Sequence, residues 1–306
     1  MSTAATRGPV VCLGVPLLDL ICERPLERPA DADMFVPHLG GVAANIAVVA
    51  ARAGTQVVLA GGAGEDEWGA WISERLSREG VRLEAFRRLP GRTTALALVT
   101  VDRAREASYT LFGEVEGATL EAIGDRLEEV LDGAAALCIG SNTLAAAPGR
   151  ALTARARELA LERGLPVIFD PNLRLHRWRS TADASASANA CVPGALLVRC
   201  NAAEAEVMTG EADPEWAALA LVKAGARLVV ISLGADGVML RGDLRADVPG
   251  VPVAQMCSTI GAGDVLTGVL LARLAQAGFY PPAAAAALRE AVAAAAGACA
   301  HWGALD

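Results

Sequence analysis

Short apolar runs that are typical of β-strands alternate along this chain with longer segments that have helical periodicity. The strand-like runs are VVCLG (10–14), VVLAGG (57–62), LCIGS (137–141), PVIFD (166–170), ALLVRCN (195–201) and RLVVISLG (227–234). Helix-like segments lie at about 43–54, 67–80, 150–163 and 215–223, and another follows residue 264. The alternation predicts an α/β fold, in which helices cover both faces of a mostly parallel sheet and sites lie at the carboxyl ends of the strands.

Two stretches break the alternation. Residues 17–40 and 93–112 contain strand-like runs, among them TTALALVTVD and ASYTLF, without a helix between them. We therefore expect these stretches to form a small sheet beside the main one. A chain of 306 residues is long enough for one large domain, so we expect residues 1–306 to fold as a single domain that carries this small sheet.

Composition excludes several classes of protein. Hydrophobic residues make up 53% of the chain and charged residues 20%, which is typical of a globular protein. The net charge of −8 argues against nucleic acid as a partner. Arg289 and Glu290 interrupt the alanine-rich end, and no uncharged stretch approaches the roughly 20 residues of a membrane helix. Pro16 and Asp19 interrupt the first apolar run, so we expect no export signal, no membrane association and a cytoplasmic location.

Cysteine and histidine indicate neither a disulfide framework nor a structural zinc site. The seven cysteines and three histidines are dispersed, and no C-x-x-C pair occurs. Most of the cysteines fall within apolar runs, where we expect small buried thiols.

The run STIGAGDVLTG (258–268) places two glycines and an aspartate directly before a strongly apolar helical segment. The first amides of a helix lack intrahelical acceptors and carry the positive end of the helix dipole, so they attract anions such as phosphate. Gly261 and Gly263 would let an anion approach the backbone closely, and Asp264 could accept a proton from a hydroxyl held beside it. Taken alone, however, the pattern favours a tight turn with Asp264 as a helix cap.

Polar residues and glycines also gather at other predicted strand ends and helix starts. They are Asp19; Gly40, Gly41 and Asn45; Asp170, Asn172 and Arg174; Asn201 and Glu204; and Ser232, Gly234 and Gly237. Each group alone fits a turn, a helix cap or a hairpin loop at least as well as it fits a functional site.

Together these pieces resemble one family. The segments GGVAANIAVVAARAG, GEDEWG, NAAE, SLGADG and TIGAGD, in this order and at these separations, are similar to those of the PfkB family of carbohydrate kinases. The resemblance extends from Val10 to Ala304. It implies a ribokinase-like, three-layer αβα fold, in which residues of about 17–40 and 93–112 form a β-sheet lid. It also implies an enzyme that transfers the γ-phosphoryl group of ATP to a sugar hydroxyl and needs Mg²⁺.

The resemblance assigns roles to the residues that match the family's motifs. Asp264 matches the catalytic base, and the amides of Gly261, Ala262 and Gly263 match those that bind the transferring phosphoryl group. Asn201 and Glu204 match residues that hold Mg²⁺, directly or through water. Acceptor-binding positions are matched by Asp19, Gly40, Gly41, Asn45, Asp170, Asn172 and Arg174, and nucleotide-binding positions by Asn201, Ser232, Gly234, Gly237 and Val292.

The acceptor class follows from two further segments. GSNTL (140–144) and FDPNLRLHRW (169–178) are similar to those of the fructokinase and 2-keto-3-deoxygluconate kinase branch. Kinases of sugar acids in this family often carry an arginine near residues 109–118, whereas this chain has Glu114 and Glu116 there. Unless Arg174 compensates, a carboxylate substrate would be repelled. We therefore expect a neutral sugar, with a sugar-acid kinase as an alternative.

Two departures from the family pattern affect cofactors. Ser258 stands where the family usually has an aspartate associated with a monovalent-cation loop, so the sequence does not predict whether K⁺ is needed. The chain also ends soon after Gly303 and Ala304, without the final helix of many members of the family. We therefore expect an adenine pocket that is either more open or completed by the helix that bears Val292 and Ala296.

Two other functions remain open at this point. A nucleoside kinase of the same family would meet similar hydroxyl groups on ribose, and a sugar-binding regulator without catalysis could keep the same fold. The retention of Asp264, Asn201 and Glu204 argues against the regulator. In related proteins the lids often pair, so we expect a homodimer formed through the lid, with sugar and ATP as the small-molecule partners.

Overall fold

A large sheet forms the centre of the molecule. The computed structural model describes residues 8–113 and 115–305. Within this part of the chain the large sheet has nine strands in the order β13-β12-β11-β10-β9-β8-β1-β4-β5. They are β1 (Val10–Leu13), β4 (Val57–Gly64), β5 (Phe86–Leu89), β8 (Ala136–Gly140), β9 (Val167–Asp170), β10 (Leu197–Asn201), β11 (Leu228–Ser232), β12 (Val238–Gly242) and β13 (Ala246–Val248). The neighbouring strands from β5 to β11 pair in parallel, and β12 pairs antiparallel with both β11 and β13.

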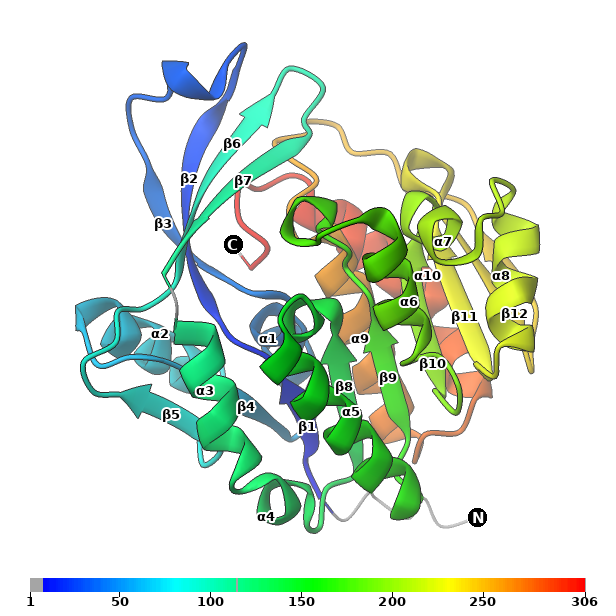
Figure 1. Cartoon of the computed structure of the whole chain (residues 1–306). Helices are drawn as coiled ribbons and strands as arrows, with labels where there is room; N and C mark the ends of the chain where they lie inside the picture. Colours follow the sequence, from blue (N-terminus) through cyan, green and yellow to red (C-terminus); the bar gives the residue numbers. More distant parts are fainter. Residues whose placement is uncertain (1–7, 114, 306) are drawn as a thin grey trace.

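Helices cover both faces of this sheet, as Figure 1 shows. One face packs against α1 (Val42–Arg52), α2 (Glu67–Arg78), α9 (Ala262–Gln276) and α10 (Pro282–Ala298). The other packs against α3 (Val115–Gly124), α4 (Leu127–Leu131), α5 (Ala147–Glu162), α6 (Thr181–Asn189), α7 (Ala202–Thr209) and α8 (Pro214–Lys223). Successive strand residues point to opposite faces, so Cys12 joins the first core and Val11 the second. The predicted three-layer α/β fold is confirmed.

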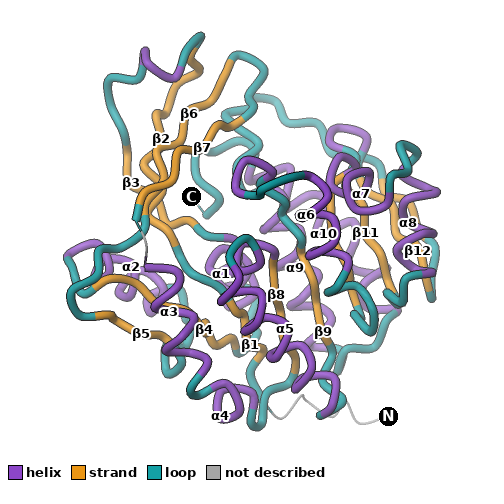
Figure 2. The backbone as a smooth tube through the Cα atoms, in the orientation of Figure 1, coloured by secondary structure: helices purple, strands orange, loops and turns teal. Residues whose placement is uncertain are grey.

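A second sheet stands apart at one end of the molecule (Figure 2). In the described residues it has four strands, in the order β3-β2-β6-β7. They are β2 (Leu17–Leu26), β3 (Val36–Gly40), β6 (Leu96–Asp102) and β7 (Ala107–Phe112). The expected small separate sheet is therefore confirmed at 17–40 and 93–112. We call these four strands the lid sheet.

The lid sheet contacts the main domain at the segment that leads into α9. Ile21, Ala97, Val99 and Val101 of the lid sheet form a small core with Ile260, which is 5% exposed and directly precedes Gly261. The predicted apolar helix is α9, and it is buried along most of its length. The lid sheet and the start of α9 are thus parts of one packed region.

Several elements are not evident from the sequence patterns. The structure adds α3, α4, α6, α7, β5, β13 and the short 3₁₀ helices Pro29–Asp31, Ser141–Leu144, Leu175–Arg177 and Gly234–Asp236. These segments are short or weakly amphipathic, so tertiary packing determines their conformation. All seven cysteines are free and five are buried, as expected. Among the described residues, no helix is long and apolar enough to span a lipid bilayer.

Candidate active site

The start of α9 meets the start of α1 at the carboxyl ends of the parallel strands. Asp264, in the first turn of α9, is 5% exposed. Its Oδ2 accepts a hydrogen bond from Asn45 Nδ2 of α1 at 2.8 Å, and its Oδ1 accepts one from Asn172 Nδ2 at 3.3 Å. Gly261 precedes the helix with φ of +74°, which glycine adopts without steric cost. The structure therefore brings together three predicted site residues from distant parts of the chain.

Burial makes Asp264 a weak acid. Loss of hydration raises its pKa from an ordinary 3.8 to about 7, and the negative charge of Asp170 adds to this rise. The hydrogen bond from Asn45 and the positive charges of Arg174 and Arg199 act in the opposite direction. A carboxylate whose pKa lies near neutrality is well matched to accepting a proton at physiological pH.

Asp19 lies where the lid sheet faces the same region. It is 7% exposed, and burial raises its pKa from 3.8 to about 7, against the charges of Arg174 and His38. Its Oδ1 is buried and has no hydrogen-bond partner. A Cβ at Gly40, on the neighbouring strand, would lie 2.1 Å from Asp19 Oδ2. The absence of a side chain at Gly40 therefore leaves space for this carboxylate. Gly41, the residue before α1, has a φ of +94°.

The loop after β9 carries Asn172 and Arg174. Asn172 adopts a positive φ of 42°, and its carbonyl accepts a hydrogen bond from Ser141 Oγ at 3.3 Å. Arg174 stacks on the Tyr109 ring of the lid sheet, with Cζ 4.6 Å from the ring centroid, a cation–π contact. Tyr109 thus contacts a predicted site residue, which the sequence did not reveal. Glu114 and the side chain of Glu116 lie outside the described residues.

A row of buried polar groups lies beneath Asp264. Asp170 is fully buried, and its Oδ2 accepts a hydrogen bond from Thr267 Oγ1 at 2.5 Å. Arg199 Nη1 lies 3.6 Å from the same oxygen, and Arg199 Nη2 donates to Ser232 Oγ at 2.9 Å. Of these four residues, sequence reasoning did not identify Arg199 and Thr267. Both lie within apolar runs, where the sequence pattern predicts buried core residues and gives no sign of a functional side chain.

Asn201 and Glu204 form a reciprocal capping box at the start of α7. Asn201 Oδ1 accepts from the Glu204 amide, and Glu204 Oε2 accepts from the Asn201 amide, each at 2.9 Å. Glu204 Oε1 accepts from the Leu173 amide at 2.8 Å. Each of the three oxygens thus already has a backbone partner, and no group of three metal-ligating side chains occurs in the described residues. This set fits Mg²⁺ held largely by water and phosphate oxygens, and not a cage of protein ligands.

The predicted nucleotide-binding loop is the turn of the β11–β12 hairpin. Gly234 and Gly237 have φ of +61° and +104°. A Cβ at Gly237 would lie 2.1 Å from the Val248 carbonyl oxygen, so the turn requires glycine there. Val292 is 5% exposed and belongs to the core between α9 and α10. Its side chain therefore has little surface left with which to contact adenine. That contact stays a prediction.

Ser258 acts within the loop before α9. Its side chain is fully buried, and its hydroxyl donates to the carbonyl of His301 at 3.2 Å. The same Oγ accepts from the Ile260 amide at 3.3 Å. Ser258 thus ties the loop to the C-terminal segment, and the need for K⁺ stays untested.

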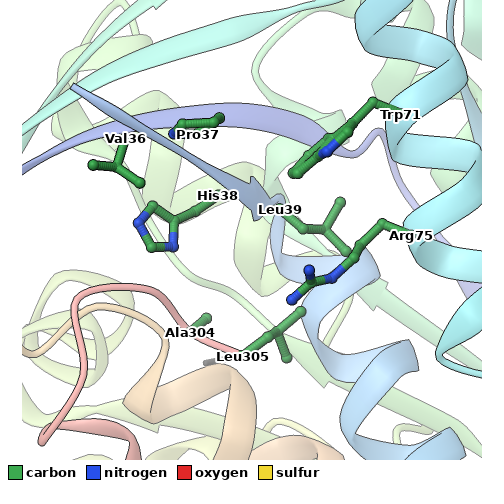
Figure 3. Close-up of a pocket in the computed structure, with 8 residues that line it drawn as sticks. All are labelled: Val36, Pro37, His38, Leu39, Trp71, Arg75, Ala304 and Leu305. Carbon is green, nitrogen blue, oxygen red and sulfur yellow. The ribbon is translucent and has the colours of Figure 1, made fainter.

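A cavity of about 290 Å³ lies beside this site (Figure 3). Trp71 and Arg75 of α2 point across it toward β3 and the C-terminal Ala304 and Leu305. None of the residues that we predict to bind substrate lines this cavity.

Comparison with known proteins agrees with this geometry. The model of the pfkB family carbohydrate kinases matches residues 9–305. Fructokinase-1 of Oryza sativa subsp. japonica is 31% identical over 269 residues, which cover 87% of this chain and 83% of that protein. Fructokinase-1 of Zea mays is 30% identical over 273 residues, which cover 89% of this chain and 84% of that protein.

Solved structures show the same fold. Fructokinase from Vibrio cholerae O395, with fructose, ADP and a calcium ion bound, has a TM-score of 0.83 at 27% identity, covering 98% of this chain and 95% of that one. Fructokinase from Xylella fastidiosa with bound ATP has a TM-score of 0.82 at 25% identity, covering 98% and 94%. The predicted ribokinase-like architecture is confirmed by these matches.

Proposed function

Because this chain belongs to the pfkB family of carbohydrate kinases and is a fructokinase-like, ATP-dependent sugar kinase, we propose that its acceptor is a small neutral sugar. We further propose that Asp264 is the general base. One observation supports this most: Asp264 is buried in the first turn of α9 and held by Asn45 and Asn172. The proposed proton acceptor, Asp264, thus lies in the same helix turn as the backbone amides that would bind the phosphoryl group.

The proposed reaction is a direct displacement. The acceptor hydroxyl oxygen forms a bond to the γ-phosphorus while the bond to the ADP oxygen breaks, and the hydroxyl proton passes to the Asp264 carboxylate. The amides of Gly261, Ala262 and Gly263 stabilise the charge on the transferring phosphoryl oxygens. General-base help of this kind contributes about 10²–10⁴-fold.

Buried acceptor atoms support a polyhydroxylated substrate. Asp19 Oδ1, Asn45 Oδ1 and Asn172 Oδ1 are buried and lack hydrogen-bond partners. Buried oxygens of this kind cost free energy unless a donor reaches them, and vicinal hydroxyl groups are suitable donors. The carboxyl groups of Asp19 and Asp264 disfavour an anionic acceptor, whereas the positive charge of Arg174, which lowers the pKa of both, would favour one. Sugar acids are therefore the alternative class of acceptor that the test must include.

We propose Mg²⁺ as the metal ion. Asn201 and Glu204 would hold it through water, and it would neutralise charge on the ATP phosphates. Asp19 and the lid sheet would cover the acceptor, which excludes water from the reaction and limits hydrolysis of ATP.

The test is release of ADP from ATP and Mg²⁺ in the presence of ketohexoses, aldohexoses, pentoses, polyols, sugar acids and nucleosides. The Asp264→Asn variant should lose at least about 10² in kcat and should still bind the acceptor. Asp132→Asn, at an exposed carboxylate, serves as the control and should match the wild type.

The outcomes distinguish the candidate functions. Turnover of one neutral sugar that disappears in Asp264→Asn supports the proposal. Turnover of nucleosides or sugar acids alone would replace the neutral sugar with that class. Wild-type kcat in Asp264→Asn would refute the role of the base. Stabilisation by a sugar without release of ADP would indicate a binding protein.

A further inference from the structure

Arg199 lies directly beneath the first turn of α9. Its strand, β10, ends at Asn201, and the side chain points to the face that packs α9, because Leu197 of the same strand belongs to that core. A Cβ at Gly263 would lie 2.4 Å from Arg199 Nη1 and 2.8 Å from Nη2. Gly263 therefore leaves the space that the guanidinium group occupies.

This placement opposes stability. A cation beside the positive end of a helix dipole is unfavourable. Arg199 is 6% exposed, and its Nε is buried without a hydrogen-bond partner, which adds a further cost. A buried, incompletely paired guanidinium group and a helix N-terminus both interact favourably with an anion. An anion bound here would therefore offset both costs.

Asp170 and Ser232 hold the guanidinium group in place. Asp170 Oδ2 lies 3.6 Å from Nη1, and Ser232 Oγ accepts from Nη2. Asp170 is itself oriented by Thr267 Oγ1, which belongs to α9. This carboxylate is fully buried and its Oδ1 has no hydrogen-bond partner, so the side-chain contacts that the structure gives it are those to Thr267 and Arg199.

We propose that Arg199 supplies a fixed positive charge to the phosphoryl group bound at the start of α9, and that Asp170 is a positioning residue for Arg199 and not a ligand of the acceptor. This inference rests on the proposed function. It assigns a role to Arg199, which the sequence did not reveal, and changes the role that sequence resemblance implies for Asp170.

The same pair acts on Asp264 with opposite signs. The charge of Asp170 raises the pKa of Asp264, and that of Arg199 lowers it. Other groups that interact with Asp264 include Asn45 of α1, Asn172 and Arg174 of the loop after β9, Tyr109 of β7 and Cys138 of β8. Arg199→Met removes the positive charge itself, whereas Asp170→Asn removes a negative charge and also takes from Arg199 the carboxylate beside its Nη1.

The experiment measures steady-state kinetics and pH profiles for Arg199→Met, Arg199→Lys and Asp170→Asn, with the neutral sugar that the wild type turns over. Arg199→Met should lower kcat by about 10²-fold with little change in KM for the sugar, and Arg199→Lys should recover part of this loss. Asp170→Asn should also lower kcat without raising the sugar KM. A sugar KM raised tenfold or more, with kcat unchanged, would instead make Asp170 an acceptor ligand.

The pH profiles provide a sign test. Asp264 must be ionised to accept a proton, so kcat/KM rises with pH through its pKa. Arg199→Met should raise the pKa of Asp264 and move the rise of kcat/KM to higher pH. Asp170→Asn should lower that pKa and move the rise to lower pH. Loss of structure alone would not produce opposite shifts. Shifts in the same direction, or none in either variant, would overturn the proposal.

Two controls separate this inference from folding and from the proposed function. Arg241 of β12 is also buried, with 4% of its surface exposed, and it pairs with Glu215 at 2.6 Å. It lies beside Val229 near the start of β11, away from the end of that strand where Ser232 contacts Arg199. Arg241→Met should lower the melting temperature without moving the rise of kcat/KM with pH. Weaker binding of a non-hydrolysable ATP analogue by Arg199→Met, measured by calorimetry, is the readout independent of turnover, and unchanged binding would contradict the proposal. Absence of turnover in the wild type would refute the proposed function instead.

Discussion

Two buried aspartates in the candidate site, Asp264 and Asp19, each have a pKa raised to about 7. Asp264 and Asp19 come from α9 and the lid sheet, and desolvation is the largest cause of the raised pKa in both. Ordinary exposed aspartates are ionised at all physiological pH values. Here the fold keeps two carboxyl groups close to the point where they exchange protons, which is a common feature of catalytic sites.

The raised pKa of Asp264 predicts the pH dependence of catalysis. The base works only when ionised, so kcat/KM for the sugar should rise through a midpoint near 7, the pKa of this carboxyl group, and level off above it. Initial rates at fixed low sugar concentration between pH 5.5 and about 8.5 measure this limb. A rate that is constant down to pH 5.5 would contradict the assignment of Asp264.

Gly40 should control the position of Asp19. In Gly40→Ala the new methyl group would lie 2.1 Å from Asp19 Oδ2, so the carboxylate must move. We expect kcat/KM for the sugar to fall by about 10–10²-fold, mainly through KM. The control is Gly117→Ala, where a Cβ meets nothing within 4 Å. Equal sugar KM values in the two variants would show that Asp19 does not bind the acceptor.

At the scale of elements, close packing of α9 against α1 places Asp264 beside Asn45. Both helices belong to the same core, and they approach each other closely at Gly268. A Cβ there would lie 2.6 Å from Val49 Cβ and 3.1 Å from the Ile46 carbonyl oxygen. Because helix α9 is buried over most of its length, neither helix can shift without disturbing the core.

Gly268→Ala should therefore destabilise the protein despite the higher helix propensity of alanine. Overpacking costs about 1–3 kcal/mol, which exceeds the gain of about 1 kcal/mol from replacing a helical glycine. Gly297 in α10 is the matched control, because a Cβ there meets nothing within 4 Å. Chemical denaturation should show a lower free energy of unfolding for Gly268→Ala and an unchanged or higher one for Gly297→Ala. The reverse order would mean that the two helices separate easily.

At the scale of the whole molecule, the lid sheet leaves apolar side chains uncovered. Leu111 and Phe112 of β7 are 36% and 49% exposed, and β7 is an edge strand of the lid sheet. Exposed edges and apolar surface of this kind favour association. The sheet thus presents one side to the acceptor region and an edge to solvent.

We expect the protein to form a homodimer through this edge. Sedimentation equilibrium at several concentrations should give twice the chain mass of 31.4 kDa. The Phe112→Lys variant should shift the equilibrium toward monomer, because a charge on an edge strand opposes pairing. Trp216→Lys, on α8 and 61% exposed, is the control. A monomer mass that does not vary with concentration would contradict this prediction.

The layers of the fold, the separate lid sheet and the position of Asp264 at the start of a buried helix can all be predicted from the amino-acid sequence. These features follow from periodicity and from residues adjacent in the chain, and local patterns report them well. The hydrogen bond between Asp264 and Asn45, which are 219 positions apart, and the placement of Arg199 beneath Gly263 were decided only by the tertiary structure. Such contacts depend on strand order and on which side chains share one end of a sheet, and no local pattern encodes either. Arg199 in particular lies in an apolar run, so its role becomes visible only when the strand and the helix above it are packed together.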